Sequence, residues 1–242
     1  MPAFKNITGA TSLFVTATDT GVGKTVVAGA IAYALRGMGV DVGVMKPAES
    51  GCKAAAGRLV PADATFLKRV SGSDDPVELI CPYRFAEPLA PAVAAKRAGI
   101  EIEIGLIRER FQYIASRHGS TIVEGAGGLM TPLSGGYLYL DLAADLGLPV
   151  VIVAPAGLGA INHTLLTYNA VRSRGLEVHA IILNRRRPGA QGLAELTNPD
   201  VIRELTGLDR VFTLPYAAGV KRSLRAVGAL ADALSGQGFF SL

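Results

Sequence analysis

Short apolar runs rich in β-branched residues alternate along this chain with longer stretches in which hydrophobic residues recur at helical spacing. This alternation is typical of strand-helix-strand units that build a parallel sheet. Strands are expected at residues 13–16, 42–45, 121–123, 150–153, 180–183 and 211–214. Helices are expected at residues 24–38, 102–117, 138–146, 161–174, 200–205 and 221–234. The pattern therefore predicts an α/β fold, a mostly parallel β-sheet flanked by helices.

Length and composition narrow the class of protein. A chain of 242 residues suits one α/β domain spanning residues 1–242. Half of the residues are hydrophobic, yet no apolar run approaches the roughly eighteen residues that a membrane span needs. The start, Met1 to Lys5, does not resemble a secretory signal, and Cys52 and Cys81 are too few for a disulfide framework. We expect a cytoplasmic protein that does not bind a membrane.

The charge gives little sign of a nucleic-acid partner. The net charge is only +4, and the single basic cluster, Arg185 to Arg187, has no interleaved aromatic residues. A solvated loop is the expected role of that cluster. Residues 53–59, rich in alanine, are expected to form a mobile surface loop.

A phosphate-binding loop is the strongest chemical signal. The first predicted strand is followed by Thr18-Asp19-Thr20-Gly21-Val22-Gly23-Lys24-Thr25 and then by a predicted helix. Glycines let successive backbone N–H groups converge on phosphate oxygens, and the helix N-terminus adds positive potential. Lys24 would reach the outer phosphates and Thr25 would offer its hydroxyl to magnesium. The loop departs from the generic pattern because Thr18 stands where that pattern has glycine; the alternative is a plain glycine-rich turn.

Further candidates lie at the carboxyl ends of predicted strands, where open parallel sheets bind ligands. Glu124 ends one strand and is followed by small residues, so it could hold magnesium, cap a helix or form a surface salt bridge. Asp63, near the start of a short helical segment, is either a helix cap or a metal ligand. Lys46 precedes a proline and either stabilises an anionic oxygen or is solvated. Ser50 and Glu49 are ambiguous.

Together these segments resemble dethiobiotin synthetase, an ATP-dependent ligase of biotin synthesis. The family pattern Gly-Thr-Asp-Thr-x-Val-Gly-Lys-Thr corresponds to residues 17–25 here. The resemblance continues through Lys46-Pro47 with Ser50-Gly51, Asp63, Phe85-Ala86-Glu87-Pro88 with Pro91, residues 123–128 and residues 158–163. It covers most of the chain through Asn184, and the last quarter matches less tightly.

The resemblance implies a reaction and a set of roles. Carbon dioxide or bicarbonate, 7,8-diaminononanoate and ATP would give dethiobiotin, ADP and phosphate, through a carbamate and a carbamic-phosphoric mixed anhydride. Mg2+ would be the cofactor, and a homodimer would place the substrate site at its interface. The implied catalytic residues are Lys46, Lys24 and Thr20, and the implied metal ligands are Thr25, Asp63 and Glu124. The implied substrate-binding residues are Thr20, Lys46, Ser50, Gly159 and Asn162. Nucleotide binding is implied for Gly21, Val22, Gly23, Lys24, Thr25, Val26, Asp63, Glu124, Gly125, Ala126, Gly127, Asn184, Arg185, Pro215 and Tyr216.

Two departures from the family pattern concern the phosphate loop. Ala17 replaces a common glycine and can keep the turn if its φ is negative. Gly21 stands at a position that is acidic in some members, so no acidic side chain can act there.

Two other classes of protein share some of these features. A dimerising ATPase switch shares the sheet and the loop, but its pattern would place lysine where Asp19 stands, and no membrane-binding amphipathic tail follows Leu234. An amide-forming synthetase for cobyrinic acid usually carries a glutamine-hydrolysing domain, for which this chain shows no persuasive Cys-His arrangement.

Overall fold

The computed structural model describes residues 12–241. The segment from Met1 to Lys5, expected not to be a secretory signal, lies outside the described residues. The assignment of residues 1–242 to one domain stays a prediction. None of the described helices has the length and apolar character needed to cross a membrane.

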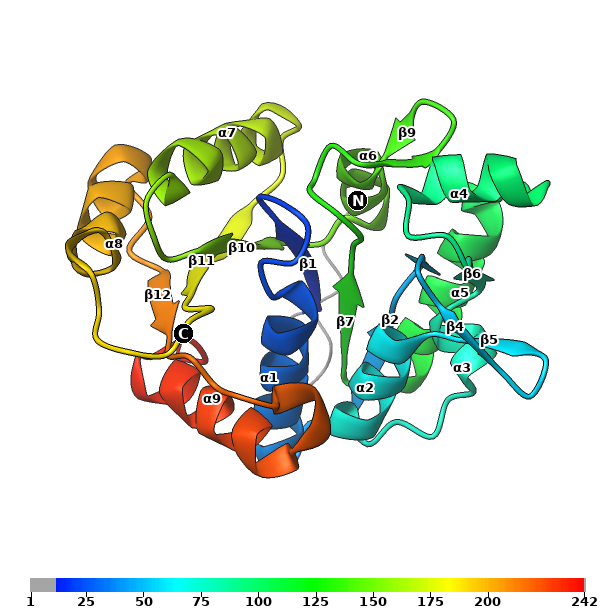
Figure 1. Cartoon of the computed structure of the whole chain (residues 1–242), viewed down its shortest axis with the longest axis horizontal. Coiled ribbons are helices and arrows are strands. Elements are labelled where there is room, and N and C mark those ends of the chain that lie inside the picture. Colours follow the sequence, from blue (N-terminus) through cyan, green and yellow to red (C-terminus); the bar gives the residue numbers. More distant parts are fainter. Residues whose placement is uncertain (1–11, 242) are drawn as a thin grey trace.

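Six parallel strands form the central sheet (Figure 1), as the sequence predicts. Their order is β12-β11-β10-β1-β7-β2, so β1 lies in the interior with β10 on one side and β7 on the other. Every predicted strand is present, at β1 Leu13–Ala17, β2 Val42–Met45, β7 Ser120–Glu124, β10 Val150–Pro155, β11 Val178–Asn184 and β12 Val211–Leu214.

Helices cover both faces of this sheet, which explains why its strands are continuously apolar. On one face Val15 and its neighbours pack against α1, α2 and α9. On the other face Phe14 and its neighbours pack against α5, α6, α7 and α8. The helices are α1 Lys24–Gly37, α2 Ala62–Ser71, α3 Val77–Ile80, α4 Pro91–Ala98, α5 Ile104–Arg117, α6 Tyr139–Leu146, α7 Ala160–Ser173, α8 Leu193–Thr206 and α9 Leu224–Gly236.

Two predicted helices need correction. The helix expected at residues 200–205 is the longer α8, which contains Pro199 in its interior. Its neighbour Asn198 donates its side-chain amide to the carbonyls of Ala156 and Gly157, so tertiary contacts hold this turn of helix in place. The helix expected at residues 221–234 begins as a short 3-10 helix, η1 (Val220–Arg222), and α9 starts afterwards, capped by the Ser223 hydroxyl.

Short strands outside the main sheet complete the fold. The expected loop at residues 53–59 is instead an antiparallel hairpin of β4 (Lys53–Ala55) and β5 (Arg58–Val60). Ala56 and Gly57 both have positive φ, as a two-residue hairpin turn of the primed type requires. Two further strand pairs are not predicted by the sequence pattern: the parallel pair β3 (Ala48–Glu49) and β6 (Tyr83–Arg84), and the antiparallel pair β8 (Pro132–Ser134) and β9 (Tyr137–Leu138).

Candidate active site

The phosphate loop joins the end of β1 to the first residue of α1. Gly23 has a φ of 110°, and a Cβ there would lie 2.1 Å from Nδ2 of Asn184, so both the backbone and the space require glycine. Gly21 also has a positive φ, of 73°, but faces open space. Ala17 ends β1 in an extended conformation, and among the described residues only Ala56 is a non-glycine with positive φ. The Ala17 departure is therefore compatible with the turn.

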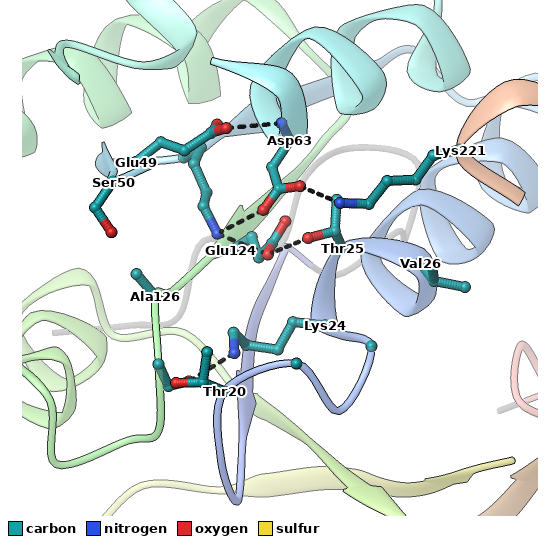
Figure 2. Close-up of a pocket in the computed structure, with 14 residues that line it drawn as sticks. Thr20, Lys24, Thr25, Val26, Glu49, Ser50, Asp63, Glu124, Ala126 and Lys221 are labelled. Carbon is teal, nitrogen blue, oxygen red and sulfur yellow. Dashed lines mark hydrogen bonds and ion pairs between the residues drawn. The ribbon is translucent and has the colours of Figure 1, made fainter. Parts of the chain in front are cut away.

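A cavity of about 420 Å³ lies over this loop (Figure 2). Its walls come from the loop, the end of β2, β3, the start of α2, the end of β7 and η1, which are far apart in the sequence. It is lined by Thr20, Gly21, Gly23, Lys24, Thr25, Val26, Lys46, Glu49, Ser50, Asp63, Glu124, Ala126, Gly127 and Lys221. The structure thus brings together most of the residues proposed for phosphate, metal and substrate.

A buried network occupies the centre of the cavity. Nζ of Lys46 donates to Oε1 of Glu124 at 2.7 Å and to the carbonyl of Gly125 at 2.8 Å. The Thr25 hydroxyl donates to the same Glu124 oxygen at 2.8 Å. Burial disfavours the charged form of Lys46, but the carboxylates of Glu124 and Asp63 outweigh it and raise the pKa of the ammonium above its ordinary value. Lys46 and Glu124 are both almost fully buried, so neither is the solvated residue or surface salt bridge weighed above.

Lys24 lies on the opposite side of the cavity. Its Nζ donates to the carbonyl of Gly127 at 2.6 Å, which links the phosphate loop to the segment after β7. Burial and the nearby charge of Lys46 lower the pKa of Lys24 to about 8. Lys24 and Lys46 place two ammonium groups in one cavity, where both can contact a polyanion, although the carboxylates of Glu49, Asp63 and Glu124 line the same cavity and balance much of the positive charge.

Asp63 is not the cap of its helix. The N-cap position is Pro61, and the carboxylate oxygens of Glu49 on β3 accept the backbone N–H groups of Asp63 at 2.9 Å and of Ala64 at 3.0 Å. Burial raises the pKa of Glu49 although these two N–H groups oppose the shift. The Asp63 carboxylate instead turns into the cavity, 2.5 Å from Nζ of Lys221 and 3.8 Å from Nζ of Lys46. Burial would raise the pKa of Asp63, but these two lysines lower it below its usual range.

The residues present fit a magnesium ion. Oε2 of Glu124 is buried and accepts no hydrogen bond, the Asp63 carboxylate faces the same cavity, and Thr25 supplies a hydroxyl. Within residues 12–241 no group of three or more His, Cys, Asp or Glu side chains could hold a metal by itself. Two carboxylates and one hydroxyl are the donor set expected for Mg2+, which commonly takes one or two carboxylates and completes its shell with phosphate oxygens and water.

A second cavity, of about 350 Å³, adjoins the first and shares Val26 and Lys221 with it. It gathers four of the residues implied for nucleotide binding from two chain segments: Asn184, Arg185, Pro215 and Tyr216. The Asn184 amide donates to the carbonyl of Val22 at 2.8 Å. The buried Val22 therefore contacts the site through its backbone carbonyl.

The prediction of a solvated loop at residues 185–187 is partly wrong. Arg185 is half-buried, and its Nε lies 3.0 Å from Oε2 of Glu195 in α8. Arg186 lines the second cavity, although its side chain is exposed. The ion pair with Glu195 therefore gives this basic turn a structural role that its sequence does not predict.

Gly159 and Asn162 lie elsewhere. They are exposed at the start of α7 and line neither of the two cavities. Leu158 beside them is 96% exposed. Within one copy of the chain, the structure does not bring these residues to Lys46 and Ser50.

Sequence reasoning left Glu49 undecided and missed Lys221 and Arg186. The contacts of Glu49 depend on α2 being folded beside β3, and no local motif signals them. Lys221 lies in the predicted last helix without a motif of its own, so only the tertiary structure shows it beside Asp63.

A glycine loop between an interior parallel strand and a helix, with a lysine and a threonine at the helix start, defines a phosphate-loop nucleotide-binding protein. Residues 11–223 match the AAA domain family. The chain belongs to the family of ATP-dependent dethiobiotin synthetases. The relative from Anaeromyxobacter dehalogenans is 46% identical over 90% of this chain and 96% of its own length. The relative from Bacillus cereus is 42% identical over 85% of this chain and 84% of its own. Both carry the name ATP-dependent dethiobiotin synthetase BioD.

Solved structures show the same fold at low sequence identity. A ParA family ATPase from Chlorobium tepidum is 13% identical with a TM-score of 0.54, covering 94% of this chain and 93% of its own. The MinC:MinD cell division protein complex from Aquifex aeolicus gives 14% identity and a TM-score of 0.56, covering 94% of this chain and 96% of that chain. These similarities support the fold class alone.

Proposed function

We propose that this chain joins carbon dioxide to 7,8-diaminononanoate and closes the ring to dethiobiotin, with ATP converted to ADP and phosphate. The observation that carries the proposal is the Lys46 ammonium. It is buried, held by Glu124 and the Gly125 carbonyl, and lines the same cavity as the phosphate-loop Lys24. Family membership supplies the substrate class.

The reaction has three steps. One amine of the diamine adds to carbon dioxide and loses a proton, which gives a carbamate. A carbamate oxygen then attacks the terminal phosphorus of ATP, and ADP leaves. The second amine attacks the carbonyl of the resulting mixed anhydride, the C–O bond to phosphate breaks, and a proton is released as the cyclic urea forms.

The cavity residues have distinct roles in this proposal. Lys24 and the loop from Gly21 to Val26 bind the outer phosphates, and the segment Gly125 to Gly127 lies beside them. Lys46 stabilises the anionic oxygens of the carbamate and of the transferring phosphoryl group. Thr20 and Ser50 orient the diamine or the carbamate by hydrogen bonds. Thr25, Asp63 and Glu124 would hold Mg2+, which neutralises charge on the transferring phosphoryl group.

The second cavity would take the nucleotide base. Asn184, Arg185, Pro215 and Tyr216 form its wall at the carboxyl ends of β11 and β12. A nucleotide in this position places its phosphates toward Lys24 because the two cavities adjoin. The adjoining position of the two cavities and the family resemblance support this assignment of the base.

The distant position of Gly159 and Asn162 supports a homodimer. Residues at the start of α7 lie at the positive end of the helix dipole and suit a substrate carboxylate. Since they lie outside the cavity of their own chain, they would complete the diamine site of a second copy. We further propose that the enzyme works in the cytoplasm, without nucleic acid or membrane as a partner.

Product analysis tests the proposal. Purified protein is incubated with diaminononanoate, bicarbonate and MgATP, and each component is omitted in turn. Dethiobiotin, identified by mass spectrometry, should form only in the complete mixture and in equal amount to ADP. ATP hydrolysis that does not need the diamine and yields no cyclic urea would contradict the proposal and favour a switch ATPase. Lys53→Ala, in the exposed hairpin, serves as a control that keeps full activity.

A further inference from the structure

Lys221 lies at the boundary between the two cavities and lines both of them. It comes from η1, and Figure 2 shows its side chain reaching toward Asp63, whose carboxylate also lies 3.8 Å from Nζ of Lys46. Its side chain is 50% exposed, whereas that of Asp63 is 24% exposed. The ammonium is therefore accessible to a ligand that enters from solvent.

The backbone around Lys221 is well fixed. Val220 is buried among the side chains under α1 and α9, and the Lys221 carbonyl accepts a hydrogen bond from Nη2 of Arg69 in α2 at 2.5 Å. Both contacts hold the main chain in place at Lys221. Because the lysine side chain is long and half exposed, the ammonium can exchange one anionic partner for another while the main chain stays in place.

The path of a bound nucleotide determines what Lys221 would meet. A nucleotide with its base beside Tyr216 and its outer phosphates at Lys24 must cross the boundary between the cavities. The two residues shared by both cavities are Val26 and Lys221, and of these only Lys221 carries charge. A cation in this position would face the phosphates nearest the ribose, which Lys24 and Lys46 do not cover.

We propose that Lys221 is a third phosphate-binding lysine of this site. Without nucleotide its ammonium pairs with Asp63 and keeps that carboxylate aimed into the cavity. When nucleotide binds, the ammonium contacts the phosphates near the ribose and leaves Asp63 free for magnesium. This inference rests on the nucleotide site of the proposed function but not on the formation of dethiobiotin.

Calorimetric titration with ATP and with adenosine tests the inference, each with and without Mg2+. Lys221→Gln should weaken ATP binding about tenfold, as expected for the loss of one charged hydrogen bond, and should leave adenosine binding unchanged. Lys221→Arg should recover most of the ATP affinity. Arg225→Gln is the matched control, since Arg225 is exposed on α9 nearby and lines neither cavity, and it should behave like the wild type.

A second measurement uses the unmodified protein. An amine-acetylating reagent is applied with ATP, with adenosine or with neither, and acetylated peptides are quantified by mass spectrometry. ATP should protect Lys221 and adenosine should not, while the exposed Lys53 should be labelled equally in all three samples.

Two results would overturn the inference. Equal weakening of ATP and adenosine by Lys221→Gln would mean that the residue only supports the base cavity. Equal labelling of Lys221 with and without ATP would mean that it makes no phosphate contact. Because both measurements report binding, they separate this inference from the proposed reaction: dethiobiotin can form normally while Lys221 fails the test, and the reverse can also occur.

Discussion

At the scale of single residues, the most consequential arrangement is the buried Lys46–Glu124 pair. Lys46→Ala should reduce turnover by about a hundredfold or more, because it removes a preorganised positive charge from the reacting oxygens. It should change the dissociation constant of ATP far less, since Lys24 and the loop still hold the phosphates. Steady-state rates and calorimetry on the same preparation, with Lys53→Ala as control, measure the two effects.

The structure adds a stability cost to this variant. Removing Lys46 leaves Glu124 charged and buried without its cation, which should lower the free energy of unfolding by about 3 kcal/mol. Adding Glu124→Gln should recover part of that loss in urea unfolding. A folded Lys46→Ala protein with undiminished turnover would contradict the proposed role.

Two further residues should govern the magnesium requirement. Asp63→Asn and Glu124→Gln each replace an anionic oxygen donor with an amide of similar size, so each should raise the magnesium concentration for half-maximal activity. Asp74→Asn, on the exposed surface between α2 and α3, is the matched control. A magnesium titration at saturating ATP measures the shift. An unchanged magnesium response in both variants would exclude the site.

At the scale of elements, the interaction of β3 with the start of α2 has a testable consequence. Glu49 accepts two backbone N–H groups with its two carboxylate oxygens, and an amide can accept with only one of them. Glu49→Gln should therefore lower the free energy of unfolding by about 1 kcal/mol and speed hydrogen exchange of the Asp63 and Ala64 amides. Asp63→Asn should leave the exchange of those amides unchanged. If Asp63→Asn speeds the exchange of these amides and Glu49→Gln does not, Asp63 rather than Glu49 caps the helix.

The sequence predicts some structural elements of this molecule better than others. The six main strands were predicted to within a few residues because helices cover both faces and every strand position must be apolar. The phosphate loop was recognisable because its glycines are required locally. The hairpin at β4 and β5 was not, since Ala56 adopts a positive φ that its residue type does not favour. The roles of Glu49 and Lys221 arise only from contacts between distant segments.

At the scale of the whole molecule, the exposed start of α7 predicts complementation between copies. If Asn162 completes the diamine site of a second chain, Lys46→Ala and Asn162→Ala should rescue each other. Random pairing in an equal mixture, unfolded and refolded together, makes about half of the dimers mixed. Each mixed dimer has one intact site and one doubly defective site, so about a quarter of wild-type activity should return.

Differential tags on the two variants confirm that mixed dimers are present before activity is read. Each variant refolded alone serves as the control and should stay inactive. If tagged mixed dimers form and activity does not return, Asn162 and Lys46 either serve the same chain's site or Asn162 has no part in the reaction.

The contact between Gly23 and Asn184 sets a limit on redesign. The Asn184 side chain, which lines the second cavity, donates to the Val22 carbonyl and also fills the space where a Cβ of residue 23 would lie. If the second cavity takes the nucleotide base as proposed, changing Asn184 to admit a different base would also disturb the glycine turn before α1. Pro215 and Tyr216 line the same cavity from the segment after β12, and the atoms nearest to a Cβ at residue 23 belong to Asn184 rather than to either of them. Attempts to retune base preference should therefore begin with those two positions.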